Sequence, residues 1–427
     1  MPVSINDMIQ EIILIEETKA SVYFYEYVSS SPFYFRPFEH FLRYVVKWAF
    51  SHHPIGYAVL GGIFLSGVSF CMLMVMSPTT KRQYGIALIG MAILLGHHAM
   101  GGSLEFNMVI SNLFTMFLFT LLMWSLFAAP NSSNLIIIPV VILGLLTKEL
   151  GLLLVGLVVL VRVLGISKIK LGTTLITLGL GIIYVAYKII TILKGDGFTF
   201  YGPGEVNYLN SLLNMVATTT NILTSFPKEA NFSLFPLLTG MSYPKWQYVH
   251  LLGSLAVTLL IIIATIPQQV TTLVRPARYR SMTFLFLILI ALTSCLAFFY
   301  TRDRHGAMVL PMLVYLFYLG ANHLAEIVPT HGLARYVAVG IVCLIAIPWG
   351  MRMAGTAFYI REASSGIRMD WYQQGPHRPA DQYHASGAGK AIVALYYGYA
   401  TEGRAPRVWL DRSWIKEWLG GNDAVVR

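Results

Sequence analysis

The chain has little charge and almost no cysteine. Only 12% of its 427 residues are charged, against about 25% in a typical soluble domain. Its three cysteines, Cys71, Cys295 and Cys343, lie inside apolar segments and have the spacing of neither a metal site nor a disulfide framework. Gly-rich nucleotide loops, Walker motifs and zinc signatures are also absent from the sequence. These absences exclude intrinsic disorder, a disulfide scaffold and a cytosolic enzyme.

The sequence instead contains many long apolar segments. Hydrophobic residues make up 56% of the chain, and the mean hydropathy is +0.64. Apolar segments recur from residue 57 to residue 354, and a spanning helix needs roughly 20 such residues. The sequence therefore predicts an all-α polytopic membrane protein. The net charge of +10 resides mainly in short loops, which is a topology signal, so we expect no nucleic-acid partner.

The apolar pattern predicts about ten transmembrane helices. The stretch 135–163 is too long for one span and carries Lys148 and Glu149 at its middle, where a charged pair would be costly. We therefore divide it into two short helices that meet near an interface. The other predicted spans are 57–76, 84–98, 108–128, 171–193, 249–266, 282–300, 307–325 and 335–354.

The positive-inside rule supports this count, because it gathers the basic loops at 81–82, 162–170 and 275–280 on one side. The opposite, outer side then receives the segment 1–56, the loop 194–248 and a small C-terminal domain at 355–427. The transmembrane domain covers 57–354. Nearly every polar group that is able to carry chemistry falls on this outer side, which is the strongest indication of a site that the residues alone provide.

The N-terminal segment has two notable features. Residues 38–50 alternate apolar and polar side chains at helical spacing, which predicts an amphipathic helix in the membrane surface. An outer N-terminal segment ordinarily follows a signal or a spanning helix, and residues 9–15 are too few to span. Either the first span translocates this segment or the chain as given lacks an initial helix, and the sequence leaves both open.

Four short motifs have a recognisable order. They are Phe35-Arg36-Pro37 with the surface helix after it, His97-His98 followed by Glu105, Thr147-Lys148-Glu149, and Tyr300-Thr301-Arg302-Asp303-Arg304-His305 before Pro311. Together they resemble the outer-face motifs of polytopic glycosyltransferases of the GT-C fold, most closely the protein O-mannosyltransferase and lipid-A aminoarabinose transferase group. The match is divergent: the usual doubled acid is reduced to Asp7, the His-Pro loop lacks its proline, and Ser111-Asn112 replaces an Arg-Asp pair. The alternatives to Asp7 are Glu16, Glu17 and Glu26.

The resemblance implies a role for each motif. Asp7 would deprotonate the acceptor, and Glu105 would assist it as a second carboxylate. Cationic side chains would stabilise the phosphate of a polyprenyl-phosphate sugar as it departs, with Arg36, His98 and Glu149 in supporting positions. The implied donor-phosphate residues are Lys148, Arg302 and Arg304.

Each motif also has a structural alternative. Arg36 is equally an interfacial anchor, His97 and His98 equally make local hydrogen bonds, and Lys148 with Glu149 equally forms a self-contained ion pair. For the whole chain, a non-catalytic GT-C-like scaffold subunit and a multi-pass transporter stay open beside the transferase. No metal site is predicted, although the resemblance leaves a divalent metal open as a cofactor. Membrane lipids and protein partners on the outer face are further expected partners, and a bacterial inner membrane is the expected location.

Overall fold

The computed structural model describes residues 36–50, 55–97, 99–100, 109–128, 133–193, 208–224, 243–265, 276–296, 303–327, 336, 340–347 and 349–350. These residues are almost entirely helical and include no strand. Within them, five helices are long and apolar enough to cross a membrane. The described part of the chain is therefore that of an all-α membrane protein, while the count of ten spans stays a prediction. The five segments are Val59–Met76, Ile110–Phe127, Leu171–Ile190, Pro276–Cys295 and Gly306–Glu326.

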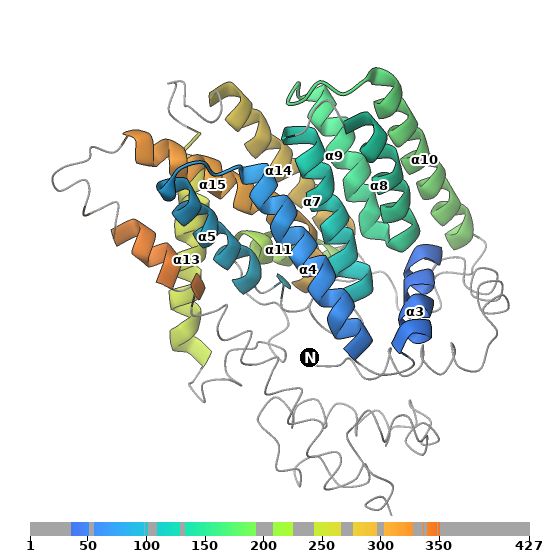
Figure 1. Ribbon diagram of the computed structural model, residues 1–427, viewed down its shortest axis with the longest axis horizontal. Helices are drawn as coiled ribbons and strands as arrows, with labels where there is room; N and C mark the ends of the chain where they lie inside the picture. Colours follow the sequence, from blue (N-terminus) through green and yellow to red (C-terminus); the bar gives the residue numbers. More distant parts are fainter. Residues whose placement is uncertain are drawn as a thin grey trace, which may run out of the picture.

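The helices pack as a bundle around one apolar core (Figure 1). The predicted helix at 38–50 is confirmed as α3 (Pro37–Phe50). The other elements are α4 (Ile55–Met76), α5 (Lys81–Gly96), η2 (Val109–Leu113), α7 (Phe114–Phe127), α8 (Ser133–Thr147), η3 (Glu149–Gly151), α9 (Leu152–Val163), α10 (Leu171–Leu193), α11 (Tyr208–Thr224), α13 (Tyr243–Ile263), α14 (Pro276–Leu296), η6 (Asp303–Val309) and α15 (Leu310–Ile327).

The long apolar stretch 135–163 is broken where the charges predicted a break. Helix α8 ends at Thr147, η3 forms a single tight turn, and α9 begins at Leu152. The prediction of two short helices in place of one long span is confirmed. Lys148 has extended backbone between them, so a buried hairpin presents Lys148 and Glu149 at its tip.

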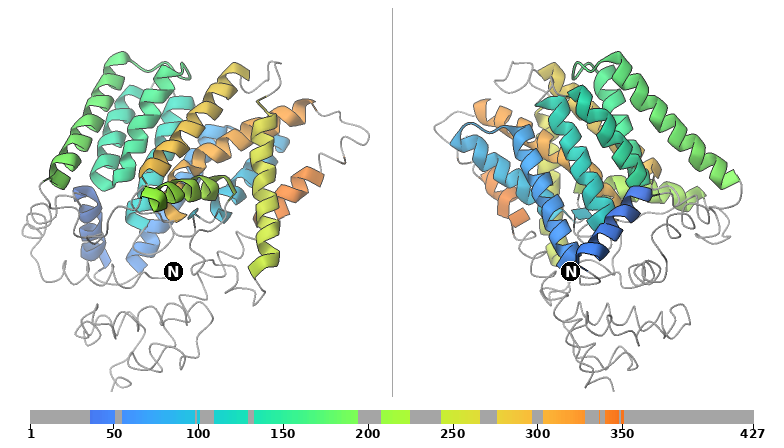
Figure 2. Two further views of the ribbon diagram at one scale, coloured as in Figure 1. Left: turned by 180° about the vertical axis from the view of Figure 1, so that it is seen from behind. Right: turned by 45° about the vertical axis from the view of Figure 1, so that its right-hand side comes forward.

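One helix was not expected from the sequence. The segment 194–248, predicted as an outer loop, contains α11, which lies crosswise to the bundle (Figure 2). It packs against α13, α14 and η6. Its composition is only moderately apolar, with Thr218, Thr219, Thr220 and Asn221 in succession, so neither length nor hydropathy distinguished it from a loop.

The basic residues of three predicted inner loops gather at one end of the bundle. The α4–α5 and α9–α10 connections and the N-terminal end of α14 lie at one end, whereas α3 lies at the other (Figures 1 and 2). The first end carries Lys81, Arg82, Arg162, Lys168, Lys170, Arg278 and Arg280. There Arg82 reaches Glu326 at 3.6 Å and the Ala325 carbonyl at 3.3 Å. This arrangement is the one that the positive-inside argument expects.

Candidate functional site

Two glycines let the α8–α9 hairpin close tightly. A Cβ atom on Gly151 would lie 2.3 Å from the backbone carbon and 2.4 Å from the backbone oxygen of Gly144. The amide of Gly151 donates to the Lys148 carbonyl at 2.8 Å, and the amide of Lys148 donates to the Gly144 carbonyl at 3.1 Å. Glycine at position 151 is thus required by a close approach of backbone to backbone, which fixes where the side chains of Lys148 and Glu149 begin.

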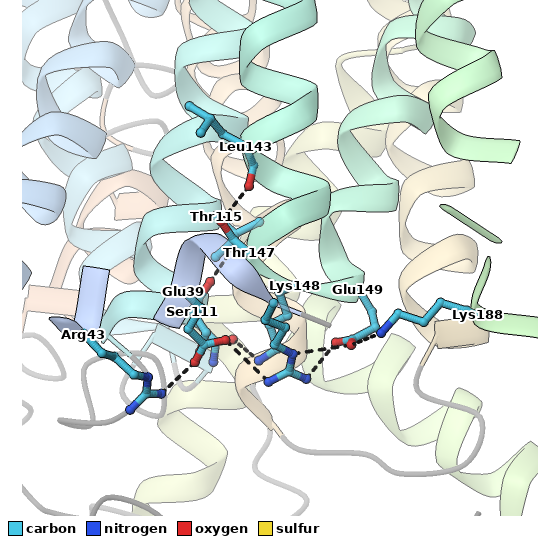
Figure 3. Close-up of polar contacts among 11 residues, drawn as sticks. Glu39, Arg43, Ser111, Thr115, Leu143, Thr147, Lys148, Glu149 and Lys188 are labelled. Carbon is cyan, nitrogen blue, oxygen red and sulfur yellow. Dashed lines mark hydrogen bonds and ion pairs between the residues drawn. The ribbon is translucent and has the colours of Figure 1, made fainter. Parts of the chain in front are cut away.

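The Glu149 carboxylate joins two cations from distant parts of the chain. Arg36, immediately before α3, donates from Nη2 to Oε2 at 2.8 Å and from Nε to Oε1 at 3.4 Å. Lys188, on α10, donates from Nζ to Oε1 at 3.2 Å. Figure 3 shows the Lys188 side chain extending to the Glu149 carboxylate. One carboxylate therefore ties the start of α3, the hairpin and α10 together.

A second carboxylate extends the ion pairs along α3. Glu39 lies 3.5 Å from Arg36 and 2.6 Å from Arg43, and the side chains of Glu39 and Arg43 are almost fully buried. The sequence of contacts is Arg43, Glu39, Arg36, Glu149 and Lys188, with charges that alternate in sign (Figure 3). Alternation keeps like charges apart in a poorly hydrated region, where an isolated charge is costly.

Lys148 belongs to the same group but has a different contact. Its ammonium donates to the side-chain oxygen of Asn112, in η2. Asn112 and Lys148 are both buried. Thus Glu149 pairs with Arg36 and Lys188, and the alternative of a pair confined to Lys148 and Glu149 is wrong. Below, "the charge cluster" means Arg36, Glu39, Arg43, Lys148, Glu149 and Lys188.

The cations keep the acids of the charge cluster ionised. Burial alone would raise the pKa of Glu149, but Arg36 and Lys188 outweigh it and hold this pKa well below its usual range. Burial likewise opposes ionisation of Glu39, yet Arg43 and Arg36 lower its pKa. The pKa of Arg36 is raised, because Glu149 and Glu39 outweigh its burial. Among the described residues, the cluster contains four basic and two acidic side chains, so its cationic character dominates.

His40 beside the charge cluster makes folding stability depend on pH. Burial lowers its pKa to about 4, with Glu39 opposing the shift and Arg43 adding to it. The unfolded chain takes up this proton near pH 6.5 and the folded chain does not. We therefore expect stability to be constant above about pH 6.5 and to fall by about 3 kcal/mol as the pH drops toward 4. Thermal unfolding in detergent at several pH values measures this.

The variant His40→Gln is the control for that titration. It removes the imidazole, so the loss of stability between pH 6.5 and pH 4.5 should become shallower. Below about pH 4.5, both proteins should lose further stability, since Glu149 and Glu39 have lowered pKa values and gain protons on unfolding. An identical slope in the two proteins above pH 4.5 would contradict the assignment to His40.

The structure brings together three of the eight residues predicted for the site, namely Arg36, Lys148 and Glu149. Asp7, His98, Glu105 and Arg302 lie outside the described residues. The backbone of Arg304 is in η6, which packs against η2 and α7, the same region that receives Lys148. The side chain of Arg304 is not among those described.

Sequence reasoning missed four members of this region: Glu39, Arg43, Asn112 and Lys188. Lys188 carried a usable signal, because a lysine near the end of a predicted span tends to be functional or paired. Glu39 and Arg43 are four residues apart on one helix and so face the same way. Asn112 is notable in the sequence only as part of the Ser111-Asn112 pair, and nothing local indicates its contact with Lys148.

His97 has a structural role. The amide of Ala99 donates to its Nδ1 at 3.2 Å, so Nε2 carries the proton and donates to the Ile222 carbonyl at 3.1 Å. Its ring also stacks on Trp349, with centroids 6.0 Å apart. His97 therefore connects the end of α5 to α11. Its bond with Ala99 is local, as the structural alternative expects, whereas its bond with Ile222 spans 125 residues.

Metal ligation finds no support in the described part of the chain, where no group of three or more His, Cys, Asp or Glu side chains is placed to hold a cation. Comparison with known proteins yields no match: no family model, no curated protein and no solved structure is similar to this chain. The charge cluster and the sequence motifs are therefore the features that indicate a function.

Proposed function

We propose that this protein is a membrane glycosyltransferase that moves a sugar from a polyprenyl-phosphate donor to an acceptor on the outer or lumenal face. The observation that carries the proposal is the convergence of Arg36, Lys148 and Lys188 at one end of the bundle, from three separate elements. Cations gathered in a poorly hydrated region suit a phosphate whose negative charge grows as the sugar leaves. A guanidinium offers paired donors, and ammonium groups add point charges.

The surroundings of the cluster favour a lipid-borne phosphate. Helix α3 buries Glu39 and Arg43 but exposes Phe41, Val45 and Trp48, and Trp48 is 88% exposed. This inverted arrangement suits an apolar medium outside the helix, with tryptophan at the membrane interface. A phosphate attached to a polyprenyl chain would meet the cluster at this depth. A bacterial inner membrane, with the cluster on its outer face, is the proposed setting.

In this mechanism Asp7 or Glu105 would accept the proton of the acceptor hydroxyl, as the resemblance to GT-C enzymes implies. Lys148 and Arg36 would hold the donor phosphate, and Arg302 and Arg304 would add to them. Glu149 would orient Arg36 and Lys188, because its two oxygens accept from both. The cluster would thus bind and stabilise the leaving group, while proton transfer lies with the carboxylates.

The test measures binding of a polyprenyl phosphate to the full chain in lipid nanodiscs. We expect Lys148→Met to weaken binding about tenfold or more, because it removes a charge-assisted contact in a buried place. Lys170→Met is the matched control: Lys170 is exposed at the opposite end of the bundle, so binding should not change. A wild-type protein that binds no polyprenyl phosphate would overturn the proposal.

Sugar transfer is measured in a second assay, with a panel of polyprenyl-phosphate sugars. Turnover that disappears in Lys148→Met supports the transferase. Binding without turnover on any donor favours the scaffold hypothesis, since the two differ in catalysis and not in the cationic site.

A further inference from the structure

Two buried polar groups beside the charge cluster have no structural explanation. The side-chain nitrogen of Asn112 and the hydroxyl of Tyr184 find no hydrogen-bond partner among the described residues. Both side chains are more than nine-tenths buried. A buried polar group without a partner is costly, and more so at membrane depth where water is scarce. Such a group in a folded protein therefore needs an explanation, and a bound ligand provides one.

The contact with Lys148 determines which way the Asn112 side-chain amide is oriented. An ammonium group only donates, so the side-chain oxygen of Asn112 faces Lys148 and its NH2 group is directed elsewhere. The orphaned atom is therefore a donor with two hydrogens. It belongs to η2, next to the hairpin tip that carries Glu149.

Tyr184 lies on α10, close to the lysine that pairs with Glu149. It lies one helical turn before Lys188 on α10, and the Lys188 ammonium is 5.4 Å from the centroid of its ring. Its hydroxyl interacts electrostatically with Glu149 and Arg36. The two orphaned donors thus lie on different helices, each beside a cation of the cluster: Asn112 contacts Lys148, and Tyr184 lies beside Lys188.

We propose that the Asn112 amide and the Tyr184 hydroxyl are uncharged donors of a phosphate-binding site, which they complete together with Arg36, Lys148 and Lys188. A phosphate presents three or more acceptor oxygens, more than the two of a carboxylate, so it is able to engage neutral donors and cations at the same time. This inference rests on the proposed function, because it assigns further residues to the same ligand. It adds that recognition depends on hydrogen-bond geometry as well as on charge.

The test uses Tyr184→Phe and Asn112→Asp in nanodiscs, with a polyprenyl phosphate and inorganic phosphate as separate probes. We expect Tyr184→Phe to weaken binding about tenfold without lowering the melting temperature, since the lost hydroxyl has no hydrogen-bond partner in the described part of the chain. We expect Asn112→Asp to weaken binding still more, because its carboxylate repels phosphate, while its contact with Lys148 becomes an ion pair and stability is maintained. Tyr84→Phe, at an exposed tyrosine of α5, is the matched control.

Each possible result either supports or overturns the inference. Weaker binding at unchanged stability supports the inference, and weakening for both probes assigns it to the phosphate and not to the lipid chain. If the wild type binds but both variants bind equally well, the inference fails while the proposed function stands. If a variant lowers the melting temperature together with binding, its side chain has a structural role and the inference is also overturned. If the wild type binds neither probe, the proposed function fails and the inference fails with it.

Discussion

Replacing Glu149 by alanine is expected to destabilise the protein by about 3 kcal/mol. The change leaves Arg36 and Lys188 without the carboxylate that both contact, and removal of one member of a buried ion pair costs about this much. Partial exposure of Glu149, 28% of its side chain, moderates the effect. Because Arg36 and Lys188 come from different elements, α3 should also loosen from the bundle. Chemical unfolding in detergent micelles gives the free energy, and hydrogen exchange of α3 gives the local effect.

Glu326→Ala is the matched control for this charge deletion. Glu326 pairs with Arg82 at 3.6 Å, and the side chain of Arg82 is about half exposed. Exposed pairs of this kind contribute at most about 1 kcal/mol. Similar losses in the two variants would contradict the view that Glu149 joins three elements.

Replacing Gly151 by alanine is expected to have an effect of similar size through backbone geometry alone. The added Cβ would lie within 2.6 Å of three backbone atoms of Gly144 and Leu145. Backbone cannot rotate away as a flexible side chain does, so the α8–α9 hairpin has to open. We expect a loss of about 3 kcal/mol, at the upper end of overpacking changes, together with weaker binding of polyprenyl phosphate because Lys148 and Glu149 are displaced.

Gly179→Ala, within α10, provides the comparison. A Cβ at this position meets no atom within 4 Å, so alanine should be neutral or should stabilise the helix by up to about 1 kcal/mol. If Gly151→Ala were as stable as the wild type, the hairpin would have adjusted to the added Cβ atom without strain. In that case the glycine would not be what positions the site.

Much of the fold was predictable because the bilayer restricts the solutions. A long apolar run has to form a helix in a membrane, since no water satisfies its backbone groups. The same physics located the break at Lys148 and Glu149, because a charged pair is costly at mid-span. Helix α11 was not predicted in this way, because its moderate hydropathy is compatible both with a loop and with a helix that packs against others.

The site was predictable only in part. Arg36, Lys148 and Glu149 stood out as rare charges next to apolar segments. Their partners did not, because ion pairs across 113 and 39 residues leave no local periodicity. Sequence spacing relates Glu39 to Arg43 on one helix face, but it does not reveal that this face turns inward.

By itself, the sequence determined that this is a helical membrane protein with a charged break near residue 148, because hydrophobic length and the cost of buried charge act locally along the chain. Tertiary structure alone decided which charges meet. Packing of α3 and α10 against the hairpin gives Glu149 two cations and places Asn112 at Lys148. These contacts depend on which helix faces oppose one another, which no single segment specifies.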